Sequence, residues 1–235
     1  MPEPETAEST WIEILSDRPT WQPERRRTVV VSPHPDDETL GAGGLIATQV
    51  SRHVPVKLLG VTDGEAAYPD SPDLGATRRL EQANAAEALG LRREELIHFS
   101  FADSDVAHSE SALVDRIEAC IDAETLLVAP WSRDPHPDHE ACGRAAAEAA
   151  RRRRCALVSY FFWTWHRFRP DCLAGLPLRR LMLSREARSR RARAINFHHS
   201  QLHREVGEPI LLEVFLAPIR RPFETFVVHG NEYSL

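Results

Sequence analysis

The chain has 235 residues, of which 42% are hydrophobic and 27% are charged, and its net charge is −6 at neutral pH. This length and composition are typical of a globular protein that folds without disulfides or structural metals as staples. No apolar stretch approaches about 18 residues and the N-terminus lacks an apolar secretory segment, so we expect no membrane span and a cytoplasmic location.

The charge is distributed unevenly along the chain. Residues 1–150 carry 28 acidic and 13 basic side chains, giving −15, whereas residues 151–235 carry 7 acidic and 16 basic ones, giving +9. Such a basic region can bind nucleic acid, but no DNA- or RNA-binding motif accompanies these arginines. We therefore interpret them as solvated helix faces that contact the acidic half, and predict no nucleic-acid partner.

The predicted elements alternate between short apolar runs and helical patterns. Residues 1–27 are expected to be a leader with one short helix around 9–16. In chain order there follow a strand at 28–32, a helix at 39–52, a strand at 56–62, a helix at 76–89, a strand at 96–101, a helix at 109–122, a strand at 125–130, a helix at 138–151 and a strand at 156–163. Two further helices are expected near 184–197 and 210–216, and a last strand at 223–228. We expect residues 28–235 to form a single domain.

This alternation predicts the fold class. Short buried strands separated by helices indicate a mostly parallel sheet with helices on both faces, a Rossmann-like three-layer α/β sandwich. A strand order of 3-2-1-4-5 would place strands one and four side by side at the switch in strand order. Ligands bind at that point, beyond the carboxyl ends of the strands.

Histidine and aspartate side chains follow both of these strands. His34, Asp36 and Asp37 come directly after the first strand, and the segment 134–139 (DPHPDH) comes shortly after the fourth. Imidazole nitrogens and carboxylate oxygens form the ligand set of a catalytic zinc, which takes three protein ligands and leaves one position open. His34, Asp37 and His139 would complete such a set.

Two further polar residues in these segments have no evident metal-binding duty. A carboxylate such as Asp36 can accept a proton from water, and an imidazole such as His136 can stabilise an oxyanion or protonate a leaving group. Each segment alone is compatible with ordinary turn chemistry. Their occurrence at matching ends of neighbouring strands instead predicts metal-assisted hydrolysis.

These motifs resemble those of the LmbE-like (PIG-L) family of zinc-dependent N-acetylglucosaminyl deacetylases. The resemblance covers about residues 28–200 and is carried by PHPDDETLGAGG at 33–44, VTDGE at 61–65, RRLEQANAAEALG at 78–90, PHPDH at 135–139 and RAINFHHSQ at 193–201. It implies zinc ligands at His34, Asp37 and His139. It also implies a general base at Asp36 and an acid or oxyanion-stabilising histidine at His136.

The same resemblance implies substrate contacts. Arg78 falls where the family has a sugar-contacting arginine, and Asp103 falls near a hydroxyl-binding aspartate. The alternatives are that Arg78 pairs with Asp73 or Glu81, and that Asp103 is a cap or turn residue.

Two positions depart from the pattern of the family. Pro33 stands where members often have alanine, and Asp134 stands where some members have a tyrosine two residues before His136. We expect a carboxylate to orient His136 and to raise its pKa. Asp138 is the favoured candidate because it opens the helix that carries His139, Asp134 is the other candidate, and a plain N-cap role for Asp138 is the competing interpretation.

Three further groups of residues are not assigned to the proposed chemistry. The aromatic run 161–166 is either core packing or a pocket wall for a sugar ring or acyl chain. Surface or capping roles are favoured over a second metal site for His198, His199 and His203. The cysteines form no CxxC pair and are predicted to be buried thiols: Cys120, Cys142, Cys155 and Cys172.

The residues predict metal-assisted hydrolysis, and the resemblance implies a zinc-dependent hydrolase that removes an N-acetyl or other N-acyl group from an amino sugar or its conjugate. The partner is a small-molecule N-acyl amino sugar or glycoconjugate, and the oligomeric state is not predicted. The alternatives are an amidase that acts on a non-sugar N-acyl conjugate, and a non-catalytic, metal-containing sugar-binding module.

Overall fold

The computed structural model describes residues 4–68, 70–204 and 207–229. Its sheet has the strand order β3-β2-β1-β4-β5-β7-β6. The strands are β1 (Thr28–Ser32), β2 (Val56–Thr62), β3 (Leu96–Phe101), β4 (Leu126–Pro130), β5 (Ala156–Tyr160), β6 (Leu178–Met182) and β7 (Phe223–Val228). Strands β1 to β5 pair in parallel, and β7 is antiparallel to both of its neighbours. The mostly parallel sheet and the order 3-2-1-4-5 are confirmed.

Helices connect most of the strands. The α-helices are α1 (Glu8–Ser16), α2 (Asp37–Ser51), α3 (Leu74–Leu89), α4 (Glu110–Glu118), α5 (Pro137–Arg153), α6 (Thr164–Arg167), α7 (Arg185–Ile195) and α8 (His199–Leu202). Short 3₁₀ segments are η1 (Glu65–Ala67), η2 (Arg93–Glu95), η3 (Val106–Ser109), η4 (Pro170–Leu173) and η5 (Glu213–Arg220). Helix α3 ends where expected, because Gly90 adopts the left-handed conformation that closes a helix.

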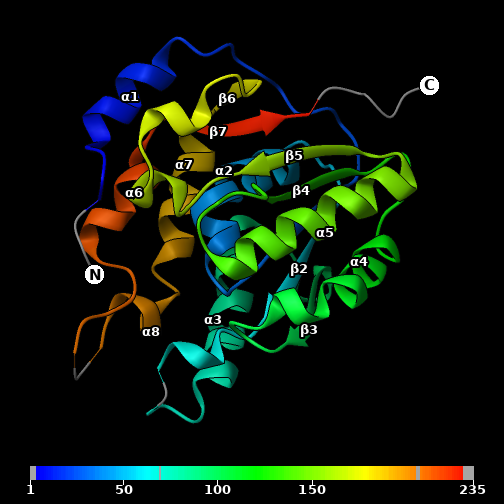
Figure 1. Cartoon of the computed structure of the whole chain (residues 1–235), viewed down its shortest axis with the longest axis vertical. Coiled ribbons are helices and arrows are strands. Elements are labelled where there is room, and N and C mark those ends of the chain that lie inside the picture. The colour runs from blue at the N-terminus through cyan, green and yellow to red at the C-terminus, as the bar shows by residue number, and fades with distance from the viewer. Residues whose placement is uncertain (1–3, 69, 205–206, 230–235) are drawn as a thin grey trace.

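The sheet is the middle of three layers (Figure 1). Helices α2, α3 and α7 pack on one face, and α4 and α5 cover the other. Successive side chains of β1 point to opposite faces, so Val30 lies in the first core and Val29 and Val31 lie in the second. Because both faces of β1 are buried, the strand is apolar without alternation.

The second half of the chain departs from the sequence-based expectation in three places. Strand β5 ends at Tyr160 rather than at residue 163, and the chain then turns into α6. Strand β6 was not expected, because its central residues Arg179 and Arg180 disguise a half-buried edge strand. The helix expected at 210–216 is a 3₁₀ segment displaced to Glu213–Arg220.

The first helix packs onto the body of the fold. Helix α1 lies at residues 8–16, close to the expected position, and Trp11 meets Trp165 edge to face at 5.1 Å between ring centroids. The indole nitrogen of Trp11 also donates to the carbonyl of Trp165 at 3.0 Å. The division into a leader (1–27) and one domain (28–235) stays a prediction, and both ranges include residues outside those described.

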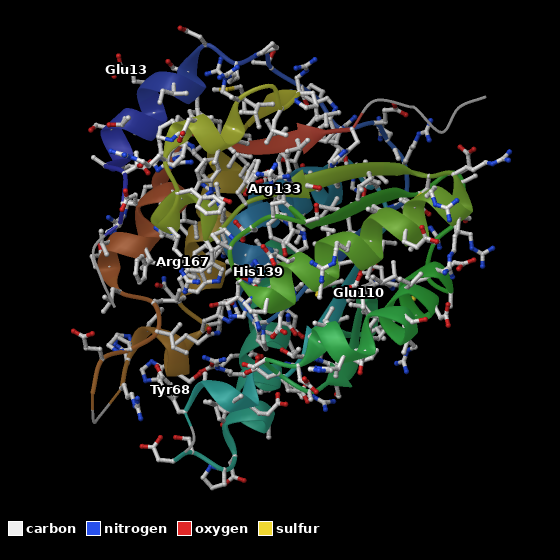
Figure 2. All side chains as sticks on the ribbon, viewed as in Figure 1. Glu13, Tyr68, Glu110, Arg133, His139 and Arg167 are labelled. Atoms are coloured by element: carbon white, nitrogen blue, oxygen red, sulfur yellow. The ribbon has the colours of Figure 1, made fainter. Side chains whose placement is uncertain are left out.

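Arginines of α5 pair with acidic residues of α4, and one of them, Arg152, belongs to the basic region 151–235. Arg144 pairs with Glu110 at 2.8 Å, and Arg152 pairs with Glu118 at 3.2 Å (Glu110 is labelled in Figure 2). The four cysteines are free thiols as expected, although only Cys142 and Cys155 are buried. Among the described residues, the helices are too short or too polar to cross a bilayer.

Candidate active site

A cavity of about 120 Å³ lies beyond the carboxyl ends of β1 and β4. These strands are hydrogen-bonded neighbours, so the segments that follow them meet at the switch in strand order, as predicted. The segments after β2, β3 and β5, helices α3 and α8 and the chain before η5 supply the remaining walls. The lining residues are His34, Asp36, Asp37, Ala67, Arg78, Asp103, Ser104, His136, Phe162, Trp163, Gln201, Ile210 and Leu211.

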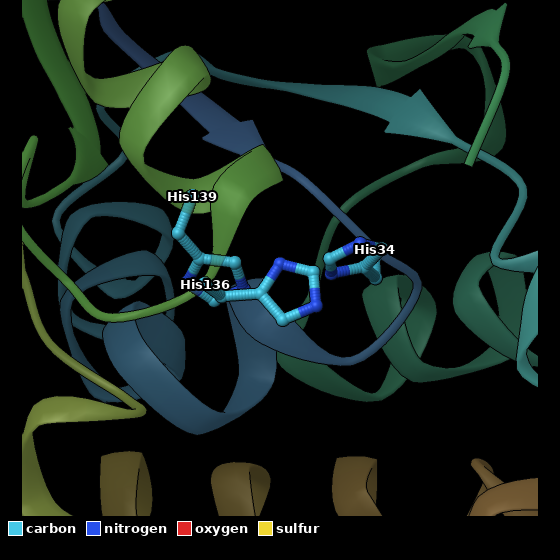
Figure 3. Close-up of side chains that lie close together, drawn as sticks. All are labelled: His34, His136 and His139. Carbon is cyan, nitrogen blue, oxygen red and sulfur yellow. The ribbon is translucent and has the colours of Figure 1, made fainter. Parts of the chain in front are cut away.

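His34, Asp37 and His139 come together beside this cavity. Oδ2 of Asp37 lies 3.0 Å from Nδ1 of His34 and 3.1 Å from Nε2 of His139. Figure 3 shows the His34, His136 and His139 rings gathered between the start of α5 and the segment after β1. Asp37 sits in the first turn of α2 and His139 in the first turn of α5, so helix geometry fixes both.

The fit of these residues to a metal ion rests on one unpartnered atom. Nε2 of His139 is fully buried and has no hydrogen-bond partner among the described residues, because its approach to Asp37 lacks hydrogen-bond geometry. A buried ring nitrogen without a partner is costly. The Asp37 carboxylate keeps its pKa well below the usual range despite burial, because His139 and His34 favour its charged form. An ionised carboxylate between two imidazoles is a zinc-type donor set.

Each of the two imidazoles also carries its own carboxylate partner. Asp134 lies 2.8 Å from Nδ1 of His139, and Asp138 lies 3.0 Å from Nε2 of His34. Burial alone would lower the pKa of His139, but Asp37 and Asp134 raise it to about 9. Carboxylates placed behind histidine ligands fix the ring orientation and increase ligand basicity.

Asp134 also anchors the segment that follows β5. Its two oxygens accept hydrogen bonds from the backbone amides of residues 162, 163 and 164 and from the hydroxyl of Thr164, at 2.6 to 3.4 Å. Asp134 is fully buried. One carboxylate therefore orients His139 and shapes the cavity wall around Trp163.

A second grouping of potential ligands shares His34. Asp138 and Asp103 both approach Nε2 of His34, at 3.0 and 3.3 Å. The Asp138 carboxylate already accepts the amides of Ser104 and Val106 at 2.8 and 3.2 Å. Because those hydrogen bonds already occupy its carboxylate, Asp138 is better suited to orient the His34 ring than to bind a metal ion.

The expected carboxylate partner of His136 is not found. Asp138 turns its carboxylate toward the loop after β3, and Asp134 turns toward His139, so neither carboxylate is hydrogen-bonded to the His136 ring. The backbone amide of Asp138 instead donates to Nδ1 of His136 at 3.3 Å, with His136 as the N-cap of α5. The competing N-cap role therefore belongs to His136 rather than to Asp138.

His136 is neutral in these surroundings. Burial, together with the charges of His34 and His139, lowers the pKa of His136 to about 4. Since Nδ1 accepts the amide of Asp138, we assign the ring proton to Nε2, the remaining nitrogen. The ring stacks on Trp163 at 16° with centroids 6.0 Å apart, and the guanidinium of Arg167 (labelled in Figure 2) covers Trp163 at 4.0 Å.

Asp36 lies at the rim of the same cavity in an unusual backbone conformation. Its φ is 139° and its side chain is buried. Burial, followed by the negative charge of Asp37, raises the pKa of Asp36 to about 8. A carboxyl group that lines a cavity and whose pKa lies near neutrality can exchange a proton with water there, and in its ionised form it can act as a general base.

The two residues expected to contact the substrate differ in how many of their polar atoms are already hydrogen-bonded. Arg78 is buried and lines the cavity; its Nη1 donates to the Gly64 carbonyl at 2.7 Å, while Nε and Nη2 have no partner among the described residues. Asp103 lines the cavity too, but it accepts the Ala66 amide at 2.9 Å and contacts His34. Arg78 does not pair with Asp73 or Glu81 in the part of the chain that the structure describes.

The remaining alternatives are resolved residue by residue. Phe161 and Trp165 pack in a core with Trp11, whereas Phe162 and Trp163 line the cavity, so the aromatic run serves both purposes. His199 and His203 are exposed surface histidines whose rings contact one another at a tilt of 43°. The surface interpretation is wrong for His198, which is fully buried 3.5 Å from Glu38.

Some residues of the site were missed by the sequence reasoning. Gln201 lines the cavity and Glu38 supports it from beneath, yet neither was assigned a role. The only sequence signal for Gln201 was its place in RAINFHHSQ at 193–201.

The fold and the site together define a class: α/β proteins with a histidine–aspartate, metal-type centre beyond the carboxyl ends of a parallel sheet. The sequence model of the GlcNAc-PI de-N-acetylase (PIG-L) family matches residues 29–150, just over half of the chain. The chain belongs to this family.

Individual relatives are distant. The chain is 31% identical over 138 residues to a probable N-acetyl-alpha-D-glucosaminyl L-malate deacetylase 2 of Bacillus cereus, a match that covers 54% of this chain and 62% of the relative. The match thus spans less than two thirds of the relative's length.

The solved structures of similar fold include deacetylases and also a 4-carboxy-2-hydroxymuconate hydratase from Pseudomonas putida, which has a TM-score of 0.55 at 20% identity over 83% of each chain. N,N'-diacetylchitobiose deacetylase from Pyrococcus horikoshii superimposes with a TM-score of 0.61 at 20% identity, over 84% of this chain and 80% of that one, which supports the fold. The A40926 pseudoaglycone deacetylase also has a TM-score of 0.61, at 28% identity over 76% of this chain and 84% of that one.

Proposed function

We propose that this protein is a zinc-dependent hydrolase that removes an N-acetyl group from an amino sugar or its conjugate. The observation that carries the proposal is the pair of carboxylate-backed histidines around Asp37, with a buried, unpartnered Nε2 on His139, directly beside a cavity that contains Asp36. The family membership and the deacetylases among its relatives support the same activity.

In this proposal His34, Asp37 and His139 hold the zinc ion. When bound, zinc would supply Lewis-acid chemistry by polarising the acyl carbonyl and lowering the pKa of water. Asp134 and Asp138 keep the two imidazoles in fixed orientations through His139 and His34.

The reaction adds water to the acyl carbon and breaks the amide C–N bond, releasing acetate and the free amine. Asp36 accepts the proton of the attacking water and returns it to the departing nitrogen. His136, neutral and protonated on Nε2, donates a hydrogen bond to the oxyanion that forms. Its stack on Trp163 holds the ring in place.

Arg78 is the leading substrate contact. Its Nε and Nη2 are buried without partners at the cavity wall, so sugar oxygens would satisfy them. The carboxylate of Asp103 already contacts His34, so it would have to bind His34 and a substrate hydroxyl at the same time. The cavity of about 120 Å³ suits an acetyl group better than a long acyl chain.

The test is metal analysis combined with a mass-spectrometric screen of amine release. Zinc-loaded protein is incubated with N-acetylglucosamine, with its conjugates, and with non-sugar N-acyl amines of similar size. Release from the sugars alone supports the proposal. Release from the non-sugar compounds alone favours the amidase alternative, and bound zinc with sugar binding but no release favours the non-catalytic module. The cytoplasmic location is checked separately by fractionation.

A further inference from the structure

The backbone at Asp36 is strained in a way that no other described residue matches. The other non-glycine residues with positive φ, namely His53, Ser100, Ser104 and Arg154, lie between 54° and 67°, in the ordinary left-handed region. Asp36 lies at 139°, a conformation that side-chain-bearing residues rarely adopt. Such a conformation persists only when the surrounding structure holds it.

One peptide unit, between Pro35 and Asp36, is held at both ends. Nε2 of Gln201 donates a hydrogen bond to the Pro35 carbonyl. At the other end the Asp36 amide points to Oε2 of Glu38 at 3.4 Å. Because the orientation of this peptide unit determines φ of Asp36, these two contacts fix the direction in which the Asp36 side chain leaves the backbone.

Glu38 is itself immobilised from several sides. Its Oε2 accepts Ser32 Oγ at 2.8 Å and Gln82 Nε2 at 2.9 Å. His198 lies 3.5 Å from its other oxygen, and the whole group is buried. The Asp36 amide therefore contacts a carboxylate that is itself held in place by buried hydrogen bonds.

Gln201 is the component that arrives from the far end of the chain. It is 1% exposed and lies in α8, 166 residues away in sequence from Pro35. Helix α8 is anchored to α3, because Ser200 donates to Glu81 through both its amide and its hydroxyl at 2.7 Å. The carbonyl of Gln201 also accepts the amide of Leu211, a cavity-lining residue, at 2.9 Å.

We propose that Gln201 is a positioning residue: its amide holds the Pro35–Asp36 peptide so that the Asp36 carboxylate faces the cavity. The catalytic consequence rests on the proposed function, whereas the backbone consequence does not. Gln201 also lines the cavity, so the competing role is direct contact with substrate. The two roles predict different kinetics and different backbone behaviour.

The test compares Gln201→Met with Gln49→Met. Gln49 is an equally buried glutamine of α2 whose Nε2 donates to the Glu24 carbonyl at 2.9 Å, outside the cavity. If Gln201 positions Asp36, Gln201→Met lowers kcat roughly 10- to 100-fold, since a small misplacement of a catalytic group has that effect. KM and zinc content stay close to wild type, and Gln49→Met keeps the wild-type kcat.

A double variant separates the positioning role from substrate contact. In an Asp36→Asn background, Gln201→Met should cause no further loss of kcat, because its effect passes through Asp36. The proposal would be overturned if the kcat losses of the two substitutions multiplied in the double variant. It would also be overturned if Gln201→Met mainly raised KM or left kcat unchanged.

A second readout does not need activity. Hydrogen–deuterium exchange of the segment 35–40 should be faster in Gln201→Met than in wild type and unchanged in Gln49→Met. Unchanged exchange in Gln201→Met overturns the positioning role even in an active enzyme. If the protein hydrolyses none of the substrates but the exchange changes as expected, the proposed function fails. The role of Gln201 in holding the Pro35–Asp36 peptide is then still supported.

Discussion

The carboxylate of Asp138 lies 3.0 Å from Nε2 of His34, although Asp138 is 104 residues away from it in sequence and only two from His136. The side chain is held there by the amides of Ser104 and Val106. The carboxylate of Asp138 is therefore paired with the ring of a proposed metal ligand, and only its backbone amide is hydrogen-bonded to the proposed oxyanion-stabilising histidine.

Asp138→Asn tests this assignment. The amide side chain keeps the shape but loses the charge that supports His34, so we expect zinc affinity to fall roughly 10- to 100-fold. Competition with a chelator measures it. The control is Asp115→Asn, which alters an exposed ion pair between Asp115 of α4 and Arg152 of α5 and should keep wild-type affinity. Unchanged affinity in Asp138→Asn together with a shifted His136 titration would restore the original expectation.

Asp36→Asn should retain zinc and lose hydrolysis. Asparagine tolerates positive φ better than most residues, so the strained backbone is preserved while the proton acceptor is removed. A general base contributes typically about 10²–10⁴-fold to the rate. We expect a kcat lower by that factor with unchanged zinc stoichiometry, measured by amine release and metal analysis. A loss of less than about tenfold would assign the base to another group.

Arg78→Met should raise KM more than it lowers kcat. Among the described residues, Nε and Nη2 of Arg78 have no hydrogen-bond partner, and hydrogen bonds to a charged group contribute roughly 1.5–3 kcal/mol. We expect KM to increase about 10- to 100-fold. Arg79→Met is the matched control, because Arg79 is half-exposed and lies 3.5 Å from Asp63. Equal effects of the two substitutions would show that Arg78 does not contact the substrate.

Folding stability should decrease with acid because of His166. Burial among Phe162, Trp163 and Phe215 lowers the pKa of His166 to about 4, against 6.5 for an exposed histidine. Between pH 6.5 and 4 the unfolded chain binds the proton and the folded protein does not, so the stability contribution present at neutral pH is lost as the pH falls. At pH 5 the loss is about 2 kcal/mol.

Urea unfolding at several pH values measures this loss, and His166→Phe should remove it. The surface variant His199→Gln should keep the wild-type pH dependence. The same acid loss in His166→Phe as in wild type would assign the effect to other buried groups.

The meeting of His34, Asp37 and His139 could be predicted from sequence because both motifs follow strands that are neighbours in a parallel sheet. The connection from Asp138 to His34 could not, since it depends on the angle at which α5 meets the loop after β3. Gln201 was missed for a related reason, because no periodic pattern links residues 166 positions apart. Strand β6 was missed because two arginines occupy the centre of an edge strand.

Asp134 has a consequence for redesign of the protein. One carboxylate accepts a hydrogen bond from the His139 ring and also from the amides of residues 162–164. The position of the cavity wall and the position of the His139 ring therefore depend on each other. Substituting Trp163 would alter the cavity wall and, because the His136 ring stacks on it, the support of that ring as well. Exchanging the whole segment for a loop of another length would move His139 as well.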